Sequence, residues 1–158
     1  MGIHRADETM RIICCGNRER GDDAAGVLVA DRLRELGIEA MVHSGEPLAL
    51  MDAWTGAEDV IIVDAVVTGA EVGTVHRWNG PQPLAAVAAP ASTHGLGLAE
   101  AIRLGRQLRR LPSQLWIYGV EGNHFAIGAK MAAEVRTAVE KVVQEIVWRV
   151  RAKSPALP

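Results

Sequence analysis

Three segments of the sequence carry acidic or imidazole side chains where strands are expected to end. Asp22 and Asp23 close the turn GNRERGDD, between a first apolar run and a first helical pattern. Asp64 follows four β-branched residues, and His94 stands in the segment STHG, before another helical pattern. Two carboxylates and one imidazole form a ligand set with room for water or a partner's atoms, as an open divalent-metal site requires.

Each segment also has a purely structural interpretation. One Asp of the pair would suffice to cap a helix, because a carboxylate accepts hydrogen bonds from the N–H groups of a first turn. Asp64 would bind backbone amides of the next loop, and His94 would lie in a first turn capped by Ser92 or Thr93. We favour the metal hypothesis because all three segments are expected at one edge of the sheet, where open α/β sheets form their sites.

Nucleophilic catalysis fits this sequence less well. No GxSxG motif occurs, and the only cysteines, Cys14 and Cys15, are adjacent in an apolar run, where we expect buried thiols rather than a disulfide. A phosphate-binding loop is disfavoured because the glycine-containing turn ends in two acids. A carboxylate pair for glycoside hydrolysis stays open, although it leaves His94 without a role.

Short apolar runs alternate with helical patterns along the chain, which predicts a layered α/β fold. The run 60–66 is apolar and rich in β-branched residues, as in a central parallel strand that is buried on both faces. The order of the elements predicts a three-layer helix–sheet–helix sandwich around a mostly parallel sheet of about five strands. The other expected strands are 11–15, 38–43, 73–78 and 115–120, and the expected helices are 25–36, 46–54, 98–108 and 135–150.

Length and composition predict one domain over residues 1–158, with flexible tails at 1–9 and 152–158. The formal net charge of -2 argues against a nucleic-acid partner, because phosphate neutralisation needs a basic surface. The longest uncharged stretch, 79–99, is interrupted by prolines and is not typical of a membrane helix. The N-terminus lacks the apolar core of a secretory signal, so we expect a cytoplasmic protein.

Four segments of the chain form an ordered set, and they are GNRERGDDAAG (16–26), IIVDAVVTGAEVGTV (61–75), STHGLGLAEAI (92–102) and GVEGNHFAIG (119–128). Taken in order, they resemble the hydrogenase maturation endopeptidases, which trim a C-terminal extension from the large subunit of nickel–iron hydrogenases. The resemblance covers most of the chain and implies a phosphorylase/hydrolase-like three-layer sandwich. The chain departs from the family pattern at Glu19, at Ala24 and around Glu46, in loops near the predicted site.

The resemblance also implies the roles of the candidate residues. It makes Asp23, Asp64 and His94 the metal ligands, and Asp22 an acid that positions the site or a water. With Asp22, Asp23 and Asp64 as the catalytic acids, the implied enzyme is an aspartic-type endopeptidase. The metal is nickel that the hydrogenase large-subunit precursor already carries, and another divalent metal is open for the isolated protein. Cleavage after nickel insertion would activate the hydrogenase.

Two alternatives remain beside this hypothesis. The first is a relative that docks on the precursor or binds metal without cleaving, which the departures at Glu19 and Glu46 motivate. The second is another hydrolase on the same scaffold, because a fold alone does not determine function.

Overall fold

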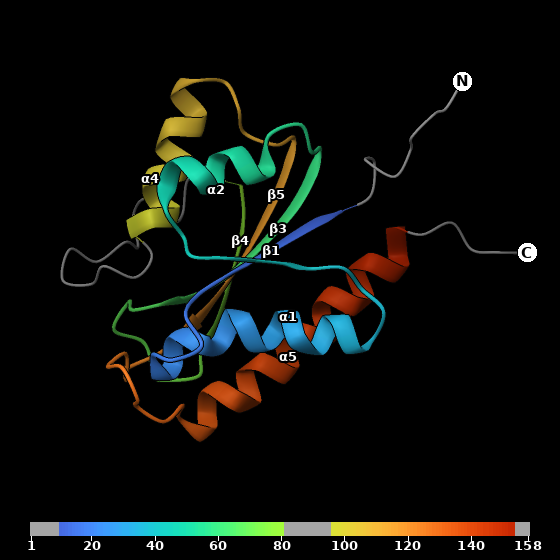
Figure 1. Ribbon diagram of the computed structural model, residues 1–158. Helices are drawn as coiled ribbons and strands as arrows, with labels where there is room; N and C mark the ends of the chain where they lie inside the picture. The colour runs from blue at the N-terminus through green and yellow to red at the C-terminus, as the bar shows by residue number, and fades with distance from the viewer. Residues whose placement is uncertain (1–9, 81–95, 154–158) are drawn as a thin grey trace, which may run out of the picture.

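The computed structural model describes residues 10–80 and 96–153 of the chain. A central sheet separates two pairs of helices, with α2 and α4 on one face and α1 and α5 on the other (Figure 1). The sheet has five strands in the order β2-β1-β3-β5-β4. This arrangement is the three-layer sandwich that the sequence predicts.

The elements follow the hydrophobic patterns closely. The strands are β1 (Arg11–Cys15), β2 (Met41–His43), β3 (Asp59–Val66), β4 (Val75–Asn79) and β5 (Gln114–Glu121). The helices are the short 3-10 helix η2 (Gly21–Ala24), α1 (Ala25–Glu35), α2 (Pro47–Trp54), α4 (Leu96–Gln107) and α5 (Ala133–Lys153).

The largest differences from the expected boundaries are at the start of β2 and the end of α5, and each has a physical cause. β2 is shorter than the expected strand 38–43, because Ile38 donates its backbone N–H to Leu33 at the end of α1 and not to a strand. α5 extends through Lys153, two residues into the expected tail, and Lys153 forms an ion pair with Asp59 at the start of β3. The remaining tail residues, 154–158, and the expected tail 1–9 lie outside the described residues.

The sheet is parallel except at one edge. β3 lies between β1 and β5 and runs parallel to both, and all its residues are buried, as its apolar sequence predicts. β4 pairs antiparallel with β5 at the edge of the sheet. The carboxyl ends of β1, β3 and β5 therefore meet at the same edge.

Each face of the sheet has its own apolar core. Val63 packs with α1 and α5 on one face, whereas Ile62 packs with α2 and α4 on the other. Cys14 belongs to the core beneath α1 and α5, and Cys15 belongs to the core beneath α2 and α4. Both cysteines are buried and free, which confirms the prediction of two buried thiols. Because side chains alternate along a strand, Asp64 lies on the same face as Ile62, beneath α2 and α4. In the described parts of the chain, no helix is long and apolar enough to cross a membrane.

Candidate active site

Asp64 is a buried carboxyl near the end of the most buried strand. Its residue is 7% exposed, and its Oδ1 atom accepts a hydrogen bond of 2.8 Å from the backbone N–H of Ala65. Burial, and to a lesser extent the negative charge of Asp23, raises the pKa of Asp64 to about 8, against the opposing effect of the Ala65 hydrogen bond. In the free protein at neutral pH, Asp64 therefore holds its proton.

Asp23 reaches the same place from the turn that follows β1. It lies in η2, which packs against β3, and it is buried. Its backbone carbonyl accepts a hydrogen bond of 3.1 Å from Asn17, which closes the turn between β1 and η2. The structure thus brings together Asp23 and Asp64, which are 41 positions apart in the sequence (64 minus 23). Two carboxylates that are buried side by side repel each other, and a divalent cation between them would relieve that repulsion.

Asp22 has a different environment from Asp23. Its Oδ2 atom accepts hydrogen bonds of 2.8 Å from the backbone N–H groups of both Asn123 and His124, and its Oδ1 atom accepts one of 2.9 Å from Ala132. The loop after β5 packs closely against Asp22. A Cβ atom added to Gly122 in this loop would lie only 2.7 Å from the Cβ of Asp22. Asp22 therefore ties η2 to the loop between β5 and α5. Its catalytic role stays a prediction.

His94, the third predicted ligand, lies outside the described residues. α4 begins at Leu96, on the α2 and α4 face that also contains Asp64. Within 10–80 and 96–153, no group of three or more His, Cys, Asp or Glu residues is placed to hold a metal ion. The proposed metal set therefore consists of two described carboxylates and an imidazole that only the sequence indicates.

Cys15 is a neighbour of the two acids that the sequence did not connect with them. Cys14 pairs with Val63 across β1 and β3, so Cys15 lies level with Asp64. Burial raises the pKa of Cys15 well above its usual value, and the charges of Asp64, Cys14 and Asp23 raise it further. The thiol stays protonated, which argues against Cys15 as a nucleophile.

Another buried carboxyl, Glu121, lies at the end of β5. It is 2% exposed, and its oxygens accept hydrogen bonds from the Thr68 backbone N–H (2.8 Å) and the Thr68 hydroxyl (2.6 Å). The Nε2 atom of His76 lies 3.0 Å from Oε1 of Glu121, and the His76 ring stacks on Trp78 with 5.2 Å between ring centroids. The pairing of His76 with Glu121 becomes visible only once β4 and β5 are in register.

The comparisons with known proteins agree with this architecture. The model of the HycI family, described as hydrogenase maturation protease, matches residues 43–149, which is more than half of the chain. The chain belongs to the hydrogenase maturation protease family. The family that the sequence motifs resemble is thus confirmed, and the protein is an endopeptidase, a hydrolase that acts on peptide bonds.

Individual relatives are distant but match over most of their length. The chain is 27% identical over 134 residues to Protein FrxA of Pyrococcus furiosus, a match that covers 83% of this chain and 97% of FrxA. Among solved structures, the hydrogenase maturating endopeptidase HybD from E. coli has a TM-score of 0.79 at 20% identity, covering 92% of this chain and 94% of HybD. HybD from Thermococcus kodakarensis has a TM-score of 0.71 at 22% identity, covering 90% of this chain and 99% of that chain. These likenesses confirm the fold.

Proposed function

We propose that the protein removes the C-terminal extension of a nickel–iron hydrogenase large-subunit precursor, and that it recognises nickel already installed in that precursor. The observation that carries the proposal is the pair of buried carboxyls, Asp23 and Asp64, at the carboxyl edge of the sheet. The negative charge of Asp23 opposes ionisation of Asp64, and a divalent cation between them would stabilise both as carboxylates, with His94 completing the proposed ligand set. Nickel enters as part of the substrate.

The chemistry follows from these positions. Nickel held between the precursor and the two carboxylates would polarise the scissile carbonyl or lower the pKa of a water. Asp64, which is protonated in the free protein, would become ionised as the cation arrives, since an adjacent positive charge favours the carboxylate. Asp22 would keep η2, and with it Asp23, in place through its three backbone hydrogen bonds.

The two departures that motivated a non-cleaving relative have structural explanations. Glu46 is the N-cap of α2, where its carboxylate accepts hydrogen bonds from the backbone N–H groups of Leu48 and Ala49. The side chain of Glu19 is exposed at the surface of the first turn. Neither residue takes the place of Asp23 or Asp64, which favours the cleaving enzyme.

The direct test incubates the purified protein with nickel-loaded and with metal-free large-subunit precursor, and follows the mass of the precursor. We expect loss of the C-terminal peptide from the nickel-loaded precursor only. Cleavage of both forms would contradict nickel recognition. If a verified cognate precursor binds but neither form is cut, the protein is the docking relative and the proposal fails.

A matched pair of variants assigns the reaction to the buried acids. Asp64→Asn is expected to lower the cleavage rate by about 100-fold or more, because the proposed ligand loses its negative charge. Asp52→Asn makes the same chemical change at an exposed position of α2 and should leave the rate within about twofold. His94→Ala extends the test to the third proposed ligand, and wild-type activity in this variant would remove His94 from the set.

A further inference from the structure

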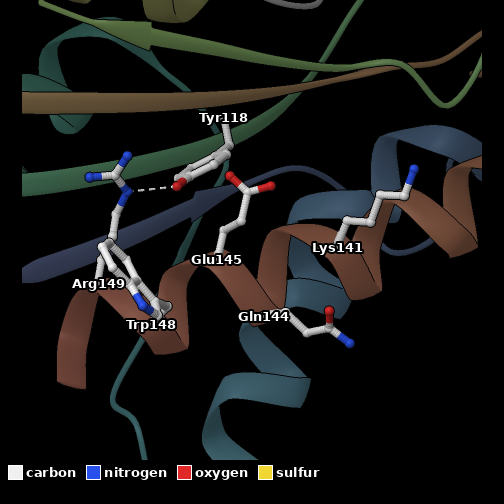
Figure 2. Close-up of a pocket in the computed structure, with 6 residues that line it drawn as sticks. All are labelled: Tyr118, Lys141, Gln144, Glu145, Trp148 and Arg149. Carbon is white, nitrogen blue, oxygen red and sulfur yellow. Dashed lines mark hydrogen bonds between the residues drawn. The ribbon is translucent and has the colours of Figure 1, made fainter. Parts of the chain in front are cut away.

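A pocket of about 330 Å³ lies on the other side of the molecule from Asp64. Tyr118 of β5 belongs to the core between the sheet and helices α1 and α5, so the sheet separates this pocket from the candidate active site. Figure 2 shows Tyr118 between the strands of the sheet and α5. The other lining residues all come from α5, and they are Lys141, Gln144, Glu145, Trp148 and Arg149.

Trp148 is a large apolar side chain that the core does not use. α5 buries a stripe of residues that includes Val139, Val142 and Ile146, whereas Trp148 is 70% exposed. An indole offers a broad, rigid apolar surface, and exposed tryptophans are enriched among the residues that dominate binding at protein interfaces. Trp148 therefore provides a surface for an apolar group of a ligand.

Arg149 is held in position by two aromatic residues. Its guanidinium carbon lies 3.6 Å from the centroid of the Trp116 ring, and its Nε donates a hydrogen bond of 2.7 Å to the Tyr118 hydroxyl (Figure 2). Its two terminal amino groups have no hydrogen bond to any described residue. A planar guanidinium that is already fixed loses little freedom when it binds a carboxylate with two parallel hydrogen bonds.

The charges around the pocket leave an excess of cations. The carboxylate of Glu145 accepts hydrogen bonds of 2.7 and 2.5 Å from Arg77. Arg77 lowers the pKa of Glu145, and Arg149 and Lys141 lower it further, so Glu145 stays ionised and paired. The structure gives Lys141 no ion pair within the described residues, so the single carboxylate of Glu145 faces three cations, Arg77, Lys141 and Arg149.

We propose that this pocket binds a short acidic segment of a partner protein. Carboxylates of the segment bind Arg149 and Lys141, which lie eight residues apart on α5, and a neighbouring apolar side chain packs on Trp148. The volume is at the lower end for ligand pockets, about 300 to 1,000 Å³, and suits one or two side chains. Two cations neutralise too few phosphates to hold nucleic acid. The proposal stands apart from the proposed function, because a segment bound here leaves the Asp64 face open.

Amide and indole NMR shifts of the isolated protein test this binding. The probe is the peptide acetyl-Leu-Glu-Phe-Asp-Glu-amide, and its uncharged counterpart is acetyl-Leu-Gln-Phe-Asn-Gln-amide. We expect saturable shifts of the amides of 141–149 and of the Trp148 indole N–H with the acidic peptide only. Equal shifts with the uncharged peptide, or no saturable shift at these positions, would overturn the proposal. Tighter binding of a single-stranded oligonucleotide at the same residues would also overturn it.

Variants with a charge-matched control make the test specific to the pocket. Trp148→Ala and Lys141→Gln are each expected to weaken binding of the acidic peptide by about fivefold or more. Arg151→Gln removes one positive charge from an exposed position of the same helix and should change the Kd by less than about twofold. If Arg151→Gln weakens binding as much as Lys141→Gln, the peptide responds only to net charge and the pocket is not its site.

Discussion

At the scale of residues, two adjacent acids do different work. The carboxylate of Asp22 is engaged by three backbone N–H groups from the loop after β5, whereas Asp23 is close enough to Asp64 to raise its pKa. The first acid orients the second, because both belong to the same four-residue η2. In this acidic pair, Asp22 therefore fixes the position of the turn, and Asp23 belongs to the candidate active site.

Asparagine substitutions separate these two roles. Asp22→Asn replaces one accepting oxygen with an NH₂ group that faces a backbone donor, and should lower the free energy of unfolding by about 2–4 kcal/mol. Asp23→Asn removes a negative charge beside Asp64 and is expected to be less destabilising. Urea denaturation of the two variants measures the difference. Equal losses of stability would show that Asp22 is no more of an anchor than Asp23.

Asp64 makes stability depend on pH in an unusual direction. Burial raises its pKa from the ordinary value of 3.8 to about 8 in the folded protein, so between these pH values the folded state keeps a proton that the unfolded state has lost. This stabilisation is complete below about pH 4 and is lost as the pH rises to about 8, by at most about 1.4 kcal/mol per pH unit. We expect metal-free protein to be less stable at pH 8 than at pH 6. Asp64→Asn should reduce that loss, and an equal loss in the variant would contradict the assignment.

At the scale of elements, the end of β5 organises the candidate site. Glu121 holds Thr68 in the loop that follows β3, and the next residues, Gly122–His124, hold Asp22 in η2. The backbone repeats this pattern, since Gly122 donates to Val66 and Asp22 donates to His124. β5 thus connects the segment carrying Asp23 with the segment carrying Asp64.

Glu121→Gln tests this connection. The amide is uncharged and has one accepting oxygen, so it binds the Thr68 backbone N–H more weakly than the carboxylate does, even when its NH₂ group donates to the Thr68 hydroxyl or to His76. We expect hydrogen exchange at the Thr68 amide to become about tenfold faster, which corresponds to about 1.4 kcal/mol. Glu71→Gln, at an exposed position of the same loop, is the control. Unchanged exchange in Glu121→Gln would show that the loop is held by its backbone alone.

The sequence predicts a helix or strand well where its formation depends on residues that are neighbours in the chain. The β-branched run of β3 and the apolar stripe of α5 follow from neighbouring residues, so periodicity finds them. The partners of Asp22 are 101 to 110 positions away, and those of Glu121 are 45 and 53 positions away. No local pattern encodes these pairings, because they depend on strand register and on where a distant loop lies. The sequence could therefore predict Asp23 and Asp64 together but could not distinguish the role of Asp22.

At the scale of the whole molecule, the sheet divides two polar regions. Asp64 lies on the face of the sheet that α2 and α4 cover, and the pocket at Trp148 lies on the face that α1 and α5 cover. Figure 1 shows these two pairs of helices on opposite faces of the sheet. A three-layer sandwich can in this way expose two surfaces to protein partners without competition between them. The two apolar cores isolate the surfaces, since each core packs against its own pair of helices.

This separation predicts that the two regions act independently. Asp64→Asn should leave the Kd for the acidic peptide within about twofold, because substitutions at sites that share no partners are usually additive. Reciprocally, Trp148→Ala should leave the fall in stability between pH 6 and pH 8 unchanged, since Trp148 contributes nothing to the burial of Asp64. Peptide titrations and urea denaturation of both variants and of the double variant provide the measurements. A coupling of more than about 0.5 kcal/mol in either measurement would mean that the sheet transmits changes between its faces.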